Sequence, residues 1–377
     1  MAGIYFHIPF CKQACHYCNF HFSTSLRYKE DMVAAMLQEL DWRKGYLGTK
    51  RVDSIYFGGG TPSLLNEAEL MAFLSAVEQH FEVSPDAEIT LEANPDDLSA
   101  ERLAALARSP VNRLSIGIQS FAEEDLRFFN RAHNAREAER CLDLAHSAGF
   151  EDLTVDLIYG APSTSDAQWA DNLRKVFAYR IPHLSCYALT VEPQTALGHF
   201  VKNGKVPPVE EEHAARQFEL LLEATQAAGY EQYEISNFAL PGRYARHNSS
   251  YWKGEPYLGI GPSAHSFRPG SRQWNIAHNA KYLRIMQCPP EEREALYERE
   301  ELQPADQYNE YVMTGLRTKW GVSLARIREI GSSYEAHFLR EAQSYLAREQ
   351  LLQKEETYYL APSARFLADG IAAGLFW

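Results

Sequence analysis

The sequence has few cysteines for its length and lacks a long hydrophobic run. Six cysteines in 377 residues are too few for a disulfide framework, and no stretch of about 18 apolar residues occurs. We therefore expect no membrane-spanning helix and a reducing compartment, with the cytoplasm as the simplest location. The first residues, MAGIYFHIPFC, also lack the basic start and apolar run of a secretory signal.

The sequence also has fewer basic than acidic residues. Lys and Arg total 37 against 50 Asp and Glu, which gives a formal net charge of −13 at pH 7. This acidic balance argues against nonspecific binding to nucleic acid or to an anionic membrane. The length favours one large domain with a smaller one beside it.

Short β-type runs alternate with amphipathic helical stretches over the first two-thirds of the chain. The expected strands are 3–9, 52–57, 88–93, 113–119, 153–159 and 183–189. The expected helices are 28–42, 67–81, 99–108, 135–148, 167–179 and 210–228. Six such βα units predict an α/β fold with a partial (βα)6, TIM-like barrel over residues 1–235. Ligand chemistry is then expected at the carboxyl ends of the strands.

The pattern changes beyond residue 235. Residues 236–300 are rich in Gly, Ser, aromatic residues and His, and we expect a linking segment there. Within 301–377, helical patterns return at 308–319, 324–330 and 334–349, before a short strand or hairpin at 353–361 and a last helix at 363–375. This order predicts a C-terminal helical domain resembling a winged-helix domain.

Three of the six cysteines follow the first expected strand. Cys11, Cys15 and Cys18 form a C-x3-C-x2-C motif. Three thiolates on one loop suit a [4Fe–4S] cluster. Such a cluster needs four thiolates to occupy all of its irons, so with three, one iron keeps an open position. The amino and carboxylate groups of S-adenosylmethionine can fill that position.

Two other interpretations of the cysteines remain open from the residues alone. Zinc would need a fourth ligand, which His7, His16 or His21 could supply. Alternatively, the thiols are only structural. The scattered Cys141, Cys186 and Cys288 are expected to be small buried hydrophobic residues.

Polar residues at the later strand ends could complete a cofactor site. A glycine run at 58–60 can bring backbone N–H groups close to a ligand. Glu92 and Asp156 lie in apolar strands, where a charge costs several kcal/mol unless it has a partner. That partner is either a bound cofactor or a salt bridge with Arg113 or Arg131.

The cysteine motif and its position resemble the radical S-adenosylmethionine superfamily. The segments IYFHIPFCKQACHYCNF, GGGTPS, LEANP, RLSIGIQSF, VDLIYGAP and RHNSSYWKGEPYLGIGPSAHSF are similar to the oxygen-independent coproporphyrinogen III oxidase family, including its C-terminal HemN-like domain. The resemblance implies contacts with S-adenosylmethionine at Tyr5, Tyr17, Gly59, Gly60, Thr61, Glu92, Gln119, Arg131, Asp156 and, through its backbone, Ala188.

Two features distinguish the chain from the genuine oxidases, which decarboxylate two propionates of coproporphyrinogen. Those enzymes carry a further cysteine where this chain has Phe20, and an N-terminal extension for which the sequence leaves no room. The chain resembles instead the HemW-type haem chaperone branch, through Cys18-Asn19-Phe20 and an HNxxYW motif at 247–252. The resemblance implies a protein that passes haem to haem-requiring respiratory proteins. It also allows a homodimer and a peripheral membrane contact.

The residues that would meet haem are less clear than those of the cluster. His247 is the expected axial ligand, while Asn248, Tyr251 and Trp252 complete the motif. His265 and His278 are rival ligands, and Arg243 and Arg246 could meet propionates. Equally, the aromatic residues could be core and His247 a hydrogen-bonded loop residue.

Two other functions stay open. One is a radical enzyme acting on coproporphyrinogen or another tetrapyrrole. The other is a barrel that keeps the cluster only for structure. No catalytic residue is assigned.

Overall fold

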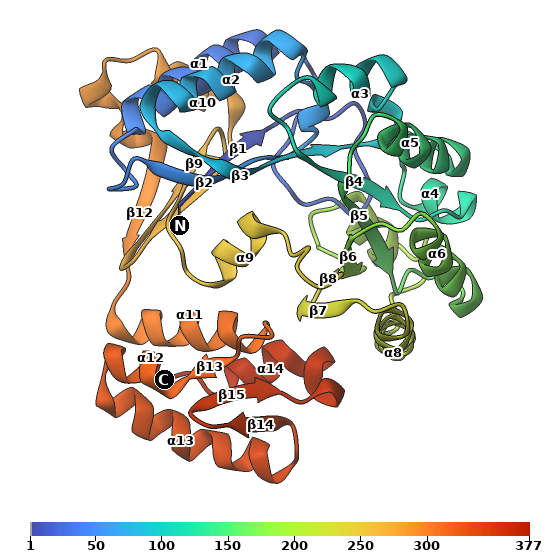
Figure 1. Ribbon diagram of the computed structural model, residues 1–377, viewed down its shortest axis with the longest axis vertical. Helices are drawn as coiled ribbons and strands as arrows, with labels where there is room; N and C mark the ends of the chain where they lie inside the picture. The colour runs from blue at the N-terminus through green and yellow to red at the C-terminus, as the bar shows by residue number, and fades with distance from the viewer. Residues whose placement is uncertain (1) are drawn as a thin grey trace.

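A mixed sheet of twelve strands, in the order β12-β11-β10-β9-β1-β2-β3-β4-β5-β6-β8-β7, forms most of the molecule (Figure 1). The computed structural model describes residues 2–377. Six consecutive parallel strands form its centre: β1 (Gly3–Ile8), β2 (Arg51–Gly59), β3 (Glu82–Ala93), β4 (Arg113–Gln119), β5 (Asp152–Tyr159) and β6 (His183–Ala188). These strands confirm the predicted partial (βα)6 barrel.

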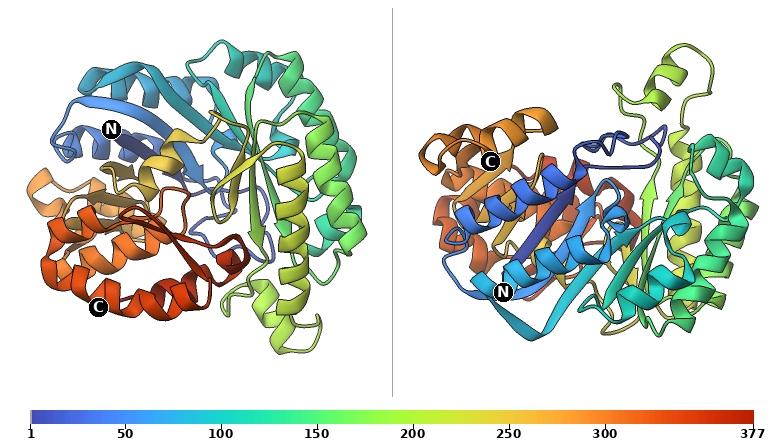
Figure 2. Two further views of the ribbon diagram at one scale, coloured as in Figure 1. Left: turned by 60° about the horizontal axis from the view of Figure 1, so that its bottom comes forward. Right: turned by 90° about the horizontal axis from the view of Figure 1, so that it is seen from above.

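Helices cover the outer face of the curved sheet, as Figures 1 and 2 show. They are α1 (Lys29–Arg43), α2 (Glu67–His80), α3 (Ala100–Ala107), α4 (Glu123–Phe128), α5 (Ala135–Ser147), α6 (Asp166–Ala178) and α8 (Glu211–Ala227). Short helical turns follow two strands, η1 (Pro62–Leu64) and η2 (Pro95–Asp97). Capping boxes begin α2, α5 and α6 at Asn66, Asn134 and Ser165, because their side chains accept the otherwise unpaired N–H groups of the first turn.

The sheet continues past the six predicted strands at both edges. At the β6 edge it gains β8 (Asn237–Ala239) and β7 (Glu231–Glu234), both antiparallel. At the other edge, β9 (Tyr257–Ile260) pairs parallel with β1. The strands β10 (His265–Arg268), β11 (Ser271–Asn275) and β12 (Tyr297–Glu301) follow in turn, each antiparallel to the strand before it. The segment expected as a linker therefore supplies five of the six flanking strands, β8 to β12. It also contains three further helical elements: α9 (Arg246–Trp252), α10 (Asn279–Met286) and η3 (Pro290–Leu296). The domain boundaries stay predictions.

A buried ionic network ties the β9–β11 flank to the barrel. Arg43 of α1 donates to Glu39 at 2.9 Å and to Gln273 of β11 at 2.8 Å. The hydroxyl of Tyr282, in α10, donates to the other oxygen of Glu39 at 2.5 Å. Because each charged group is hydrogen-bonded, the buried pair fixes the position of the flank.

The last part of the chain has its own apolar core, around Tyr308, Val312, Phe338 and Tyr358. It contains α11 (Pro304–Leu316), β13 (Val322–Ser323), α12 (Leu324–Ile330), α13 (Ser332–Ala347), β14 (Leu351–Lys354), β15 (Thr357–Leu360), η4 (Pro362–Leu367) and α14 (Ala368–Ala373). Its likeness to a winged-helix domain stays a prediction. Arg317 joins this part to the barrel by pairing with Glu234 at 3.1 Å. Among residues 2–377, we find no helix that is both long and apolar enough to cross a membrane.

Candidate functional site

The three clustered cysteines lie on the loop after β1, at the carboxyl ends of the barrel strands. Figure 2 (right) shows this loop at the top of the barrel, near the projecting segment that contains α7 (Ala196–Lys202). The backbone N–H of His16 donates to the carbonyl of Phe129 at 3.0 Å. The N–H of Leu197, in α7, donates to the carbonyl of His16 at 2.8 Å. The loop is therefore held by two later βα units, as expected for a site at this end of the barrel.

A cavity of about 470 Å³, here called the cysteine pocket, opens beneath that loop. Its volume is within the usual range for small-molecule sites. The three cysteines line it together with Tyr17, Gly59, Gly60, Thr61, Glu92, Gln119, Arg131, Asp156 and Ala188. Tyr5, the other residue expected to contact S-adenosylmethionine, lines a second cavity deeper in the barrel. The ligand roles of all these residues stay predictions.

Arg131 is the cation of the cysteine pocket. Its guanidinium donates to Cys15 Sγ at 3.2 Å, to Asn94 Oδ1 at 2.5 Å and to the carbonyl of Gly117 at 2.7 Å. Its buried Nε has no hydrogen-bond partner within residues 2–377. A fixed cation with a spare N–H group fits a site for thiolates and a carboxylate-bearing ligand.

Burial raises the pKa of Cys11 to about 11 and also raises the pKa of Cys18. Metal ions bind the thiolate, so iron would have to displace these protons on binding. Three thiolates on one loop would leave one iron of a [4Fe–4S] cluster open, so these residues fit the predicted cluster.

Glu92 and Asp156 are two half-buried carboxylates that form no ion pair within residues 2–377. Burial raises the pKa of Glu92 to about 8 and that of Asp156 to about 6. Glu92 accepts a hydrogen bond from Tyr56 at 2.8 Å, and Asp156 a long one from Ser115 at 3.4 Å. Neither forms an ion pair with a described residue, so the salt-bridge alternative is not formed. A cationic ligand would favour the ionised form of both.

Close packing requires glycine in the turn at the end of β2. Gly59 has a φ of +102°, and a side chain there would lie 2.7 Å from the ring of His7. A Cβ at Gly60 would lie 2.6 Å from the carbonyl of Phe10, and the Gly60 N–H donates to Ile8. Glycine is thus required for the turn to approach the start of the cysteine loop.

Gln119 ends β4 with a φ of +67°, a conformation that is costly for a residue with a side chain. Such backbone strain clusters at ligand sites, and Gln119 lines the cysteine pocket.

The second cavity, of about 680 Å³, is here called the barrel chamber. It shares Phe20, Glu92, Asp156 and Tyr187 with the cysteine pocket, so the two cavities adjoin. The HNxxYW residues His247, Asn248, Tyr251 and Trp252 all line the chamber. The motif and the cysteines, more than 200 residues apart in the sequence, therefore line neighbouring cavities.

The structure also shows what holds the motif. Glu88 caps α9, because its carboxylate accepts from the N–H of Arg246 at 2.8 Å and of His247 at 2.9 Å. His247 Nδ1 is hydrogen-bonded to Ser54 at 2.9 Å, and its ring stacks on Tyr56. Burial lowers the pKa of His247 to about 4, so its imidazole is neutral at pH 7.

Asn248 has a structural role in the described chain. It donates to the Tyr233 hydroxyl at 3.1 Å and accepts from the Trp252 indole at 2.9 Å. Tyr233 is in turn hydrogen-bonded to His183 at 2.7 Å.

Most of the other residues predicted as possible haem contacts are bonded elsewhere in the structure. Arg243 pairs with Asp152 at 2.8 Å, Arg246 donates to the carbonyl of Asp86 at 2.6 Å, and neither lines the barrel chamber. His278 accepts the Lys281 N–H as the N-cap of α10. His265 lines the barrel chamber.

The zinc alternative finds little support. His7 is bonded to the carbonyl of His21 at 2.8 Å, His16 to that of Phe128 at 2.9 Å, and His21 to Asn279 at 2.7 Å.

Sequence reasoning missed Glu88, Ser54 and Asn94, which position the motif helix, His247 and Arg131. Only Asn94 gave a signal, because it directly follows the polar strand end in LEANP.

Comparison with known proteins agrees with this geometry. Residues 5–176 match the model of the radical SAM superfamily. The chain is 31% identical to heme chaperone HemW of Bacillus subtilis over 376 residues, which covers 98% of each chain. It is 40% identical to heme chaperone HemW of Escherichia coli over 267 residues, covering 70% of this chain and 69% of that one.

A solved structure shares the fold. Coproporphyrinogen III oxidase (HemN) of Escherichia coli, described as a radical SAM enzyme, superposes with a TM-score of 0.85 at 23% identity, covering 100% of this chain and 90% of that one. On the near full-length similarity to the Bacillus subtilis relative, the chain belongs to the HemW heme chaperone family of the radical SAM superfamily.

Proposed function

We propose that this protein is a haem chaperone, which binds haem and passes it to haem-requiring respiratory proteins. The observation that carries the proposal is that the cysteine pocket adjoins the chamber lined by the HNxxYW motif, with Phe20, Glu92 and Asp156 lining both. The names of the relatives, heme chaperones in several bacteria, support the same function.

In this proposal Cys11, Cys15 and Cys18 hold a [4Fe–4S] cluster, and S-adenosylmethionine binds at its open iron. Glu92 and Asp156 meet the positive charge of the cofactor, while Arg131 offers an N–H group to its carboxylate. When reduced, such a cluster can supply the electron that cleaves the sulfonium group. Six free thiols fit a reducing compartment, so we place this activity in the cytoplasm.

The test is an anaerobic titration of haem into the reconstituted protein, with and without S-adenosylmethionine, together with an assay for 5′-deoxyadenosine. We expect saturable haem binding. Haem binding that never saturates would contradict the proposal. Size-exclusion chromatography and vesicle flotation of the loaded protein test the proposed homodimer and peripheral membrane contact.

The oxidase is the second candidate function, because the fold of HemN covers the whole chain. Against it, the oxidase cysteine is replaced by Phe20, which lines the cysteine pocket and is 66% exposed. Incubation with coproporphyrinogen, S-adenosylmethionine and a reductant separates the two functions. We expect no protoporphyrinogen, and its formation would favour the oxidase.

A further inference from the structure

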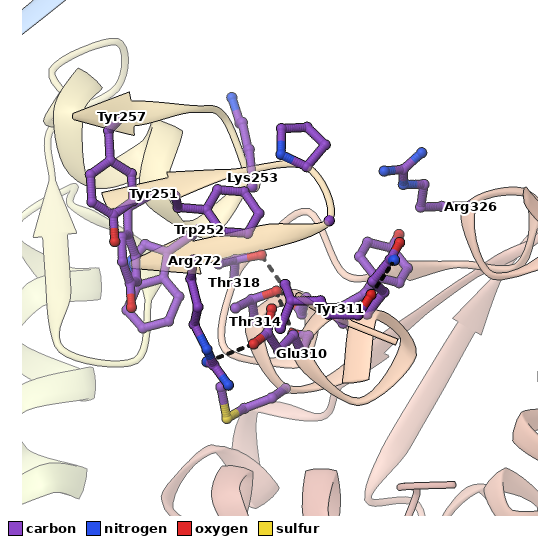
Figure 3. Close-up of a pocket in the computed structure, with 18 of the residues that line it drawn as sticks. Tyr251, Trp252, Lys253, Tyr257, Arg272, Glu310, Tyr311, Thr314, Thr318 and Arg326 are labelled. Carbon is purple, nitrogen blue, oxygen red and sulfur yellow. Dashed lines mark hydrogen bonds and ion pairs between the residues drawn. The ribbon is translucent and has the colours of Figure 1, made fainter. Parts of the chain in front are cut away.

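A third cavity, of about 480 Å³, lies between the β9–β11 flank and α11, and is here called the α11 cleft. Figure 3 shows Tyr251, Trp252 and Tyr257 grouped on one side of it, and Glu310, Tyr311 and Thr314 of α11 on the other. Tyr251 and Met313, which both line the cleft, are 49% and 39% exposed. Open aromatic surface within a cleft of this size is typical of a binding site.

The cleft and the barrel chamber differ in the chemistry of their walls. The chamber carries Glu92, Asp156, Arg113 and Asn237, so a large apolar ligand there would leave charged groups desolvated. Aromatic residues line both cavities, but Arg272 and Glu310 of the cleft are paired with each other at 2.7 Å, so the aromatic faces of the cleft suit a flat ring system. Tyr251 and Trp252 line both cavities, and they form the half of the HNxxYW motif that reaches the cleft.

We propose that the tetrapyrrole cargo binds in the α11 cleft, on Tyr251 and Trp252, with the His265 imidazole as the ligand of its iron. The inference rests on the proposed function, which supplies haem as the cargo, and it specifies where haem binds.

His265 has the properties that such a ligand needs. It lines both the cleft and the chamber, and its side chain is exposed. Its ring stacks on Trp274 at 6.3 Å, and neither nitrogen forms a hydrogen bond to another residue in the described part of the chain. Partial desolvation by its neighbours lowers its pKa, which favours the neutral form of the imidazole that binds metals. His247, in contrast, is stacked on Tyr56 and faces the polar chamber.

A cation for the carboxylates of the cargo is also present. Lys253, next to Trp252, lies over the ring of Trp320 at 4.3 Å and forms no ion pair with any described residue. Arg272 is already held by Glu300 at 2.6 Å and Glu310 at 2.7 Å. We therefore assign the propionate contact to Lys253.

This placement gives the two halves of the motif different roles. Glu88 and Asn248 fix α9 from within the barrel, through its first turn and through Trp252. The last turn of α9 then presents Tyr251 and Trp252 to the cleft. Cargo held there lies outside the barrel, where an acceptor protein can reach it.

The experiment uses the full chain with its cluster reconstituted, titrated with haem and separately with iron-free protoporphyrin. His265→Ala removes the iron ligand, Thr314→Trp fills the cleft, and His146→Ala, at an exposed histidine of α5, is the matched control. We expect His265→Ala to shift the haem absorbance band and raise the Kd for haem by roughly tenfold or more, with protoporphyrin binding retained. Thr314→Trp should abolish binding of both, and His146→Ala should change neither.

Other outcomes distinguish a failure of the α11 cleft as the haem site from a failure of the proposed chaperone function. If the unaltered protein binds haem but His247→Ala, and not His265→Ala, removes the iron signal, the inference is wrong and the proposed function stands. If Thr314→Trp keeps its cluster absorbance and binds both porphyrins normally, the cleft is not the site. If the unaltered protein does not bind haem saturably, the proposed function itself fails.

Discussion

Replacing the half-buried Glu92 by Gln should stabilise the cofactor-free protein and weaken its binding of S-adenosylmethionine. The amide keeps an acceptor for the Tyr56 hydroxyl, now 2.8 Å from Glu92, and removes only the charge. Burial raises the pKa of Glu92 from 4.5 to about 8, so the folded protein binds a proton that the unfolded chain releases. The stability contributed by this proton is therefore present below about pH 4.5 and is lost as the pH rises to about 8.

The magnitude follows from the pKa difference. Between pH 4.5 and 8 the charge costs the folded state on the order of a few kcal/mol. Urea unfolding of the cofactor-free protein at pH 5 and pH 8 should show Glu92→Gln more stable than the unaltered chain at pH 8, with a smaller difference at pH 5. Glu124→Gln, at an exposed residue of α4, is the control.

Binding should change in the opposite direction. Loss of one charged hydrogen bond to the cationic cofactor costs about 1.5–3 kcal/mol, which raises the Kd for S-adenosylmethionine by roughly 10- to 100-fold. Anaerobic equilibrium dialysis measures this. An unchanged Kd, or a Glu92→Gln protein that is less stable at pH 8, would refute the reasoning.

Three further predictions concern the cluster, the motif helix and the flank. Serine at Cys11, Cys15 or Cys18 should abolish bound iron and its visible absorbance, whereas Cys141→Ser should retain both, as iron analysis will show. Glu88→Ala leaves two buried N–H groups of α9 unpaired, so it should lower local stability by about 2–4 kcal/mol and speed hydrogen exchange in that helix, while unchanged exchange would contradict the capping role. Glu39→Ala leaves Arg43 buried and uncompensated, which should cost about 3–5 kcal/mol, measured as a lower Tm; Asp41→Ala, at a half-exposed site of the same helix, should cost far less.

The sequence alone predicted the barrel strands because each combines an apolar run with a polar or glycine-rich end. β4, from Arg113 to Gln119, is buried along nearly its whole length, which makes such a run easy to recognise. The flanking strands were missed because they are short: β8 has three residues, and β7, β9 and β10 have four each. Their stability comes from distant partners such as Arg43, which donates to Gln273 some 230 residues away.

The residues of the candidate site, like the strands, were only partly predictable from the sequence. Cysteine spacing and strand-end residues are local signals, so the residues of the cysteine pocket could be named from the sequence. The positions of Glu88 and Ser54, which hold His247, depend on the packing of α9 against β2 and β3, and no local pattern encodes that contact. The α11 cleft could not be predicted either, because its walls come from residues 251–272 and 302–330, which are separate segments of the sequence.

The central claim, that the chain delivers haem, is tested most directly by transfer. Haem-loaded protein is mixed anaerobically with the apo form of a respiratory haem protein, and the absorbance of the acceptor is followed with and without S-adenosylmethionine. We predict transfer that is faster than from free haem at the same concentration and that is lost when the cluster cysteines are replaced. Haem that stays on the chain, or reaches the acceptor equally fast without it, would contradict the account.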